Sequence, residues 1–163
     1  MKFGLTGDTH NNLKNIREIC SIFNRYELDF VIHTGDITLS KSLELFKELK
    51  MPLKGVFGNN DQDEKQSLLE VCKRENFQFS DFLEIKISNS KSVYAVHDPK
   101  DIEDYFYAPG NIIVHGHTHR FRNEIIKDSY IFNPGECAGL MKGFNSIGII
   151  EANESPKMEI INF

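Results

Sequence analysis

Short hydrophobic runs alternate with amphipathic stretches through the first half of the chain. This alternation is typical of βαβ units that build a mostly parallel sheet. Hydrophobic residues that recur every three or four positions predict the helices, and uninterrupted hydrophobic runs predict buried strands. Strands are expected at residues 3–6, 30–32 and 53–57, and helices at 13–25, from Ser40 until Pro52 stops the helix, and around 64–75.

The hydrophobic pattern changes in the second half of the chain, which contains many short strand-like runs joined by short connections. Only residues 102–107 have a helical pattern there. A second, more antiparallel sheet, stacked on the first and with helices outside, would accommodate these runs. They are residues 83–87, 93–96, 112–115, 125–126, 131–132, 146–150 and 158–161.

Length and composition narrow the class of protein. A chain of 163 residues, 40% of them hydrophobic, has the size of one domain, 1–163, with a single core. The net charge of −5 argues against nucleic-acid polymers and anionic membranes as partners, because both attract basic surfaces. The chain has three cysteines without CxxC spacing, no signal-peptide core and no hydrophobic run of membrane length. Together these features predict a cytoplasmic protein.

Residues of metal-ligating type follow five of the predicted strands, where an α/β sheet places its ligand sites. Residues two apart in extended backbone face the same side, so Asp8 with His10, and His117 with His119, are expected to converge on a cation. The candidate ligands are Asp8, His10, Asp36, Asn59, His97, His117 and His119.

Each of these pieces has a simpler explanation when it stands alone. Asp-x-His, Gly-Asp and Gly-Asn are typical of turns, and a single histidine commonly packs in the core or on the surface. The pieces together, in this order and all at strand ends, favour a metal site. The chain has no Walker-type phosphate loop and no serine in a nucleophile elbow, so kinase and serine-hydrolase functions have no support.

The same motifs resemble the signature of the calcineurin-like metallophosphoesterase superfamily, over almost the whole chain. The resemblance points to its small single-domain phosphodiesterases from bacteria and archaea, which also tend to contain Asn-Pro-Gly, here residues 133–135. It implies an α/β fold, a four-layer α-β-β-α sandwich in which helices flank two stacked mixed sheets. The motifs that carry it are Asp8-Thr9-His10, Gly35-Asp36, Gly58-Asn59-Asn60-Asp61, His97 and Gly116-His117-Thr118-His119.

The resemblance implies a pair of divalent metal ions, with Mn²⁺ or Ni²⁺ favoured and Zn²⁺, Fe²⁺ or Co²⁺ also suited to nitrogen and oxygen ligands. Asp36, Asn59 and Asn60 are the expected catalytic residues. A hydroxide that bridges the metals would attack a small phosphodiester or nucleotide-like substrate. The implied ligands are Asp8, His10 and His119 for one metal, Asn59, His97 and His117 for the other, and Asp36 as the bridge.

The chain departs from the signature at two positions. Asn60 stands where the signature has a histidine that protonates the leaving oxygen, and an amide cannot act as a general acid at neutral pH. This change favours diesters over monoesters with poor leaving groups. Asp98-Pro99 follows His97 where relatives read Gly-His, and we hypothesise that Asp98 alters substrate specificity.

Two other functions stay open. One is a non-catalytic protein-interaction scaffold on the same fold, as in the retromer subunit of this superfamily, although every ligand position here holds a competent side chain. The other is a metal-dependent phosphomonoesterase, which Asn60 disfavours. The resemblance also implies a homo-oligomer, a dimer or tetramer, and His33 and His115 are expected to be packing residues.

Overall fold

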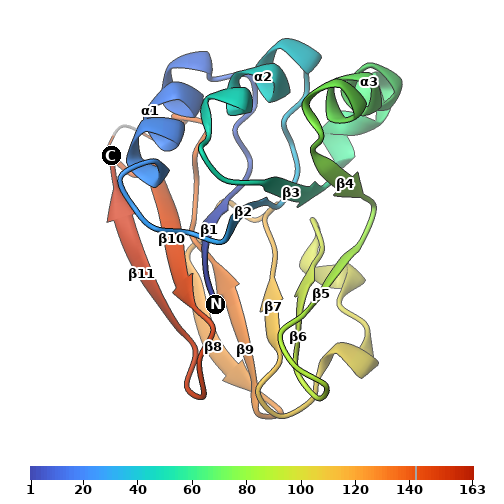
Figure 1. Ribbon diagram of the computed structural model, residues 1–163, viewed down its shortest axis with the longest axis vertical. Helices are drawn as coiled ribbons and strands as arrows, with labels where there is room; N and C mark the ends of the chain where they lie inside the picture. Colours follow the sequence, from blue (N-terminus) through green and yellow to red (C-terminus); the bar gives the residue numbers. More distant parts are fainter. Residues whose placement is uncertain (142) are drawn as a thin grey trace.

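The computed structural model describes residues 1–141 and 143–163, which form two stacked sheets beneath a group of helices (Figure 1). The strand order is β11-β10-β1-β2-β3-β4 in the first sheet and β5-β6-β7-β9-β8 in the second. The first sheet consists of β1 (Lys2–Thr6), β2 (Phe30–His33), β3 (Leu53–Val56), β4 (Gln78–Ser80), β10 (Ser146–Glu151) and β11 (Lys157–Asn162).

The first sheet is larger than the sequence predicts. Strands β1 to β4 are parallel, but β10 runs antiparallel to β1 and β11 antiparallel to β10. The prediction that residues 146–150 and 158–161 belong to the second sheet is therefore wrong. Five of the six residues of β10 are buried, so this strand needs a neighbour on each side, and the open edge of β1 supplies one of them.

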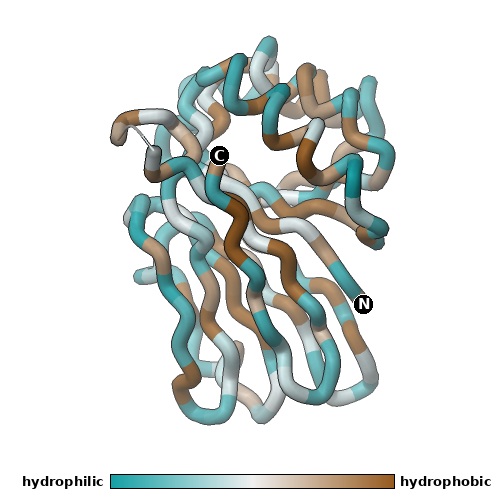
Figure 2. Tube along the Cα trace, turned by 90° about the vertical axis from the view of Figure 1, so that its left-hand side faces the viewer, coloured by the Kyte–Doolittle hydropathy of each residue, from teal (hydrophilic) through white to brown (hydrophobic). Residues whose placement is uncertain are grey.

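The second sheet is mixed, as predicted. Strands β6, β7 and β9 are parallel, whereas β5 and β8 are antiparallel strands at the two edges. Its strands are β5 (Leu83–Lys86), β6 (Ser92–Ala95), β7 (Ile112–Val114), β8 (Arg122–Ile126) and β9 (Ser129–Asn133). Hydrophobic positions recur along the strands of both sheets in Figure 2, and the side chains between the sheets form one core.

Helices cover the outer face of the first sheet, and the first two are shorter than expected, whereas the third lies where the sequence predicts it. The side chain of Asn12 caps the first helix by accepting a hydrogen bond from the backbone of Asn15 at 3.1 Å. The second helix tightens into a 3₁₀ turn and ends before Leu49, well short of Pro52. These elements are α1 (Leu13–Phe23), α2 (Ser40–Leu45), η1 (Phe46–Glu48), the 3₁₀ helix η2 (Asn59–Glu64) and α3 (Lys65–Glu75).

The layer outside the second sheet is thin. The helix expected at residues 102–107 is only the 3₁₀ turn η4 (Asp104–Phe106), which follows a similar turn, η3 (Pro99–Asp101). Phe106 stacks on Tyr94 of β6 with ring centroids 4.5 Å apart, and it covers part of this face. The two stacked mixed sheets confirm the predicted fold class, and 3₁₀ turns replace α-helices in the outermost layer of the described chain.

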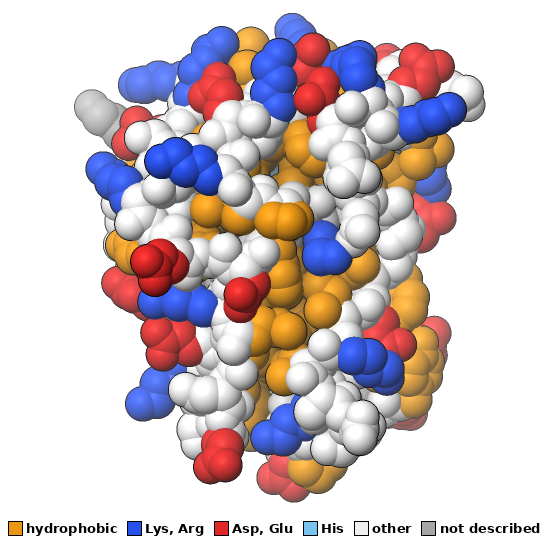
Figure 3. Space-filling model, viewed as in Figure 1, with side chains coloured by type: hydrophobic (Ala, Val, Ile, Leu, Met, Phe, Trp, Pro, Cys, Tyr) orange, Lys and Arg blue, Asp and Glu red, His pale blue; other side chains and the backbone are white. Residues whose placement is uncertain are grey.

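The outer surface is charged and carries both signs. Figure 3 shows Lys, Arg, Asp and Glu side chains spread over one face, with a band of hydrophobic side chains between them. Within residues 1–141 and 143–163, no helix is long and apolar enough to cross a membrane.

Candidate metal centre

All seven candidate ligands come together at one end of the two sheets. Asp8 and His10 follow β1, Asp36 follows β2 and Asn59 follows β3 in the first sheet. His97 follows β6, and His117 and His119 follow β7 in the second sheet. The carboxyl ends of these parallel strands thus bring Asp8 and His117, which are 109 positions apart, into contact.

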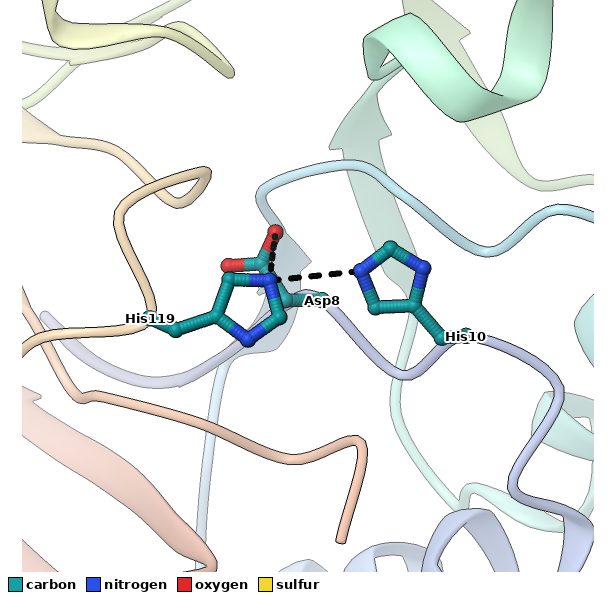
Figure 4. Close-up of side chains that lie close together, drawn as sticks. All are labelled: Asp8, His10 and His119. Carbon is teal, nitrogen blue, oxygen red and sulfur yellow. Dashed lines mark hydrogen bonds and ion pairs between the residues drawn. The ribbon is translucent and has the colours of Figure 1, made fainter. Parts of the chain in front are cut away.

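The first group of ligands is Asp8, His10 and His119 (Figure 4). Nε2 of His10 lies 3.3 Å from Nε2 of His119, which is 3.8 Å from Oδ1 of Asp8. One ligand atom from each residue lies within 4.8 Å of the others. This spacing suits three ligands on one face of a cation.

The second group is Asn59, His97 and His117. Oδ1 of Asn59 lies 2.9 Å from Nε2 of His97 and 3.0 Å from Nδ1 of His117. The two histidine nitrogens are 3.2 Å apart. Two imidazoles and an amide oxygen therefore face a common point, as the ligands of a second cation would.

Asp36 lies between the two groups. Its Oδ2 is 3.4 Å from Nε2 of His10, and its Oδ1 is 3.4 Å from Nε2 of His97. Asn60 holds this carboxylate in place, because its backbone N–H donates to Oδ1 at 2.9 Å and its side-chain amide donates to Oδ2 at 2.7 Å. One carboxylate oxygen thus faces each group, which is the geometry of a bridging ligand.

The backbone at the site differs from the extended conformation that the sequence suggested. Asp8, His10, Asp36, His117 and His119 all have positive φ, between 39° and 64°. Non-glycine residues rarely adopt this left-handed conformation, and such strain clusters at functional sites. The convergence of each i, i+2 pair therefore comes from left-handed turns after the strands, and the prediction of extended alternation is wrong.

Groups behind the histidines fix their orientation. Nδ1 of His97 lies 2.8 Å from the carbonyl oxygen of Thr34, so Nδ1 carries the proton and Nε2 is free to bind a metal. Nε2 of His117 lies 3.6 Å from Oδ2 of Asp98. A carboxylate at the outer nitrogen of a histidine fixes the orientation of the imidazole ring. The effect of Asp98 on specificity stays a prediction.

Glu136 plays the corresponding part for His119. Its Oε2 is 3.7 Å from Nδ1 of His119, and its two oxygens accept hydrogen bonds from the backbone of Ala138 and Met141. The available sequence signal was the position of Glu136 directly after Asn-Pro-Gly. The structure buries this carboxylate, and a buried charge needs a partner. The motifs in the sequence gave Glu136 no role.

Asp61 ties two of the loops together. Its carboxylate is fully buried and accepts backbone hydrogen bonds from Asp36, Ile37, Thr38 and Gly58, at 2.7 to 2.9 Å. Burial raises the pKa of Asp61 above its usual value, and the hydrogen bonds from Gly58 and Thr38 oppose that rise. These contacts show that Asp61 orients the loops that carry Asp36 and Asn59.

Burial and charge shift the pKa values of the central groups in opposite directions. Burial raises the pKa of Asp8 to about 6. Burial also favours a higher pKa for Asp36, but hydrogen bonds from His97 and Asn60 outweigh it and hold that pKa well below its usual range. Burial opposes the charged form of His97, yet the neighbouring Asp36 carboxylate raises its pKa to about 8. The Asp36 carboxylate and the His97 imidazole therefore favour each other's charged forms.

The other two buried histidines support the loops rather than face the ligands. Nδ1 of His33 accepts from the backbone N–H of Gly35 at 3.1 Å, so its Nε2 donates to the hydroxyl of Thr9 at 3.2 Å. Burial lowers the pKa of His33 to about 3. Nδ1 of His115 lies 2.9 Å from the carbonyl oxygen of Gly116. Both side chains are buried, as the predicted packing role requires, and their hydrogen bonds also join the loops that carry Asp8, Asp36 and His117.

Cys137 is also structural. It is fully buried, and burial raises the pKa of its thiol to about 11. A thiol in that state is a poor nucleophile at neutral pH.

Nitrogen and oxygen ligands from two sheets, with a carboxylate between them, fit two divalent cations. This fold and donor set define the class of metal-dependent phosphoesterases. Residues 1–155 match the model of the calcineurin-like phosphoesterase superfamily domain, and the chain belongs to this superfamily. The predicted enzyme class, a hydrolase of phosphoric esters, is confirmed.

A phosphodiesterase from Methanocaldococcus jannaschii is 32% identical over 165 residues, which cover 99% of both chains. The solved structure of an archaeal phosphodiesterase has a TM-score of 0.81 and 29% identity, and the match covers 99% of this chain and all of the other. These two similarities extend over the sheets and every loop that carries a candidate ligand.

More distant structures share the fold alone. A phosphoesterase from E. coli has a TM-score of 0.75 at 19% identity, over 99% of this chain and 98% of its own. Vps29 from Entamoeba histolytica has a TM-score of 0.66 at 18% identity, over 100% of this chain and 99% of its own.

Proposed function

We propose that the protein is a dinuclear metal-dependent phosphodiesterase. The observation that carries the proposal is the position of Asp36, with one carboxylate oxygen toward each ligand group. Asp8, His10 and His119 would hold one ion and Asn59, His97 and His117 the other. The phosphodiesterase of M. jannaschii, which is similar over the full chain, supports the same substrate class.

Two bound dications would supply an activated water and withdraw charge from the phosphoryl oxygens. The residues of the chain provide the setting for that chemistry. Asp8 and Asp36 contribute two negative charges, while the neutral ligands Asn59 and four histidines leave the centre with excess positive charge toward an anionic substrate. Asn60 orients Asp36 through its backbone and its side chain.

The side chain at position 60 also favours a class of ester. Its amide nitrogen is engaged with Asp36 at 2.7 Å, and an amide has no proton to give to a leaving oxygen at neutral pH. Esters whose leaving groups depart without protonation are therefore the better substrates.

The intact ligand set argues against a non-catalytic scaffold. A scaffold needs neither seven convergent ligands nor the strained backbone that five of them adopt. The held carboxylates behind His117 and His119 add positioning contacts that a docking surface does not require.

The finer assignments are part of the same proposal. Mn²⁺ or Ni²⁺ is the favoured metal, because the ligands are imidazole, carboxylate and amide without thiolate. The three cysteines are free and buried, which suits a reducing cytoplasm. We also propose that residues 1–163 act as one domain that associates into a dimer or tetramer.

The test is hydrolysis of bis-p-nitrophenyl phosphate and p-nitrophenyl phosphate by metal-stripped protein refilled with Mn²⁺, Ni²⁺ or Zn²⁺. Metal-dependent cleavage that prefers the diester is expected, and Asp36→Asn should lower it more than about 100-fold. Asp63→Asn is the matched control, since Asp63 is exposed on η2. No turnover with any metal in folded, metal-loaded protein would contradict the proposal and favour the scaffold.

A further inference from the structure

An apolar hollow lies beside the first ligand group. Its volume is about 380 Å³, and His119 and Glu136 form part of its wall. We call it the apolar hollow and define it by its main hydrophobic residues, Phe121, Met141, Phe144 and Ile160. Its size is within the ~300–1,000 Å³ range of sites for small molecules.

The hydrophobic side chains of this hollow are unusually open to solvent. Phe121 is 58% exposed, Met141 is 52% exposed and Phe144 is 64% exposed. Three of the nine large hydrophobic side chains that are exposed among the described residues thus line one hollow. A soluble protein rarely gathers such groups on its surface unless they bind something.

The hollow and the candidate metal centre share one side chain, that of His119. Nε2 of His119 faces His10 and Asp8, and Nδ1 of the same ring faces Glu136, whose backbone contacts hold the loop that carries Met141. Figure 4 shows His119 at the edge of its ligand group, opposite His10. A molecule held at the centre by its phosphate therefore reaches the hollow past a single imidazole.

The other side of the centre is polar. A second hollow of about 430 Å³ borders Asn59, His97 and His117, and its walls include Gln62, Lys65 and Asp98. The two ligand groups thus lie between an apolar hollow and a polar one. A phosphodiester carries two organic groups on one phosphorus, so one group would face the apolar hollow and the other the polar one.

We propose that the apolar hollow binds one organic group of the phosphodiester, an aromatic or other flat apolar group, while the phosphate lies at the metal centre. The inference rests on the proposed function and deepens it by naming the chemistry of one ester arm. Phe121 and Phe144 act as specificity-determining residues, because an aromatic group between them removes their exposed hydrophobic surface from water.

The test compares two phosphonates that differ only in the organic group. Phenylphosphonate and methylphosphonate are titrated into the Mn²⁺-loaded protein by calorimetry, which needs no turnover. The wild-type protein should bind phenylphosphonate roughly tenfold more tightly. Phe144→Ala, or Phe121→Ala as a second variant, should reduce that preference to about twofold without weakening methylphosphonate.

The matched control is Leu140→Ala, because Leu140 is 75% exposed on the same loop and does not line the hollow. This variant should keep the full preference for the phenyl group. In kinetics with bis-p-nitrophenyl phosphate, Phe144→Ala should raise KM by a similar factor and leave kcat within about twofold, since the residue does not touch the phosphorus.

The outcomes separate the two proposals. Equal affinity for both phosphonates in a protein that cleaves bis-p-nitrophenyl phosphate overturns the apolar subsite and leaves the phosphodiesterase standing. Absence of both binding and cleavage in metal-loaded protein overturns both. If sedimentation shows that Phe144→Ala separates subunits while the phenyl preference persists, the hollow is a contact between copies of the chain, and the inference is wrong.

Discussion

Removal of the Asp61 carboxylate should weaken both the fold and the metal centre. Each of its oxygens accepts two backbone hydrogen bonds, Oδ1 from Ile37 and Thr38 and Oδ2 from Asp36 and Gly58. Asp61→Ala leaves these four N–H groups without their partner. A buried donor that loses its partner costs about 1–3 kcal/mol, less where water enters the space.

The four bonds together predict a loss of roughly 4 kcal/mol in the free energy of unfolding, taking about 1 kcal/mol for each. For a chain of this length that corresponds to a fall in Tm of about 8–16 °C. Asp61→Asn should also destabilise, because its amide group presents donors to two of the same N–H groups. Because Asp61 holds the backbone of Asp36, metal affinity should fall about 10- to 100-fold as well.

The assay is urea unfolding of the metal-free protein followed by circular dichroism, with metal affinity measured by competition with a chelator. Asp63→Ala is the control on the same 3₁₀ helix, and it should change stability by no more than about 0.5 kcal/mol, since Asp63 is exposed. A loss below about 1 kcal/mol for Asp61→Ala would refute the view that this carboxylate ties the two loops together.

Two more predictions concern buried side chains around the centre. The pKa of His33 is about 3 in the fold and about 6.5 in the unfolded chain. The part of the free energy of unfolding that depends on neutral His33 is therefore complete above pH 6.5 and is lost as pH falls toward 3. The loss is roughly 3 kcal/mol by pH 4. In urea unfolding of the metal-free protein from pH 8 to 4, the free energy of unfolding of His33→Gln should therefore fall less steeply with pH than that of the wild-type protein. An equally steep fall in both proteins would contradict this prediction. Glu136→Gln should weaken metal binding about tenfold, as measured by competition with a chelator. The control Glu159→Gln, at an exposed residue, should not change metal affinity. Equal metal affinity of Glu136→Gln and the wild-type protein would exclude a role for Glu136 in positioning His119.

The periodicity of the sequence was enough to predict most of the strands and helices, and the motifs at the strand ends predicted the residues that come together at the site. Strands β1, β2, β3 and β6 lie where hydrophobic runs predict them, because each is buried on both faces. Strand β4 was missed, since it has only three residues and pairs with β3 alone. The helix expected at 102–107 has a helical spacing of hydrophobic residues, but the chain makes only one 3₁₀ turn there.

Two features of the site lay beyond the sequence. The left-handed backbone at Asp8 and His117 is imposed by the loops around them, and non-glycine residues give no local signal for it. The partner of His119 is Glu136, which comes close only because the turn after β9 leads back to the first sheet. In that turn Glu136 pairs with Asn145, just before β10. Local patterns identify ligand types, whereas contacts between distant loops depend on the completed fold.

The pairing of β1 with β10 has a consequence for synthesis of the chain. Lys2 lies opposite Glu151, so β1 presents an open edge of hydrogen-bonding groups until β10 has left the ribosome. The four parallel strands can form earlier, but that edge is able to pair with another nascent chain in the meantime. The late arrival of β10 thus leaves the first strand of the chain exposed to mispairing until almost the whole chain has been made.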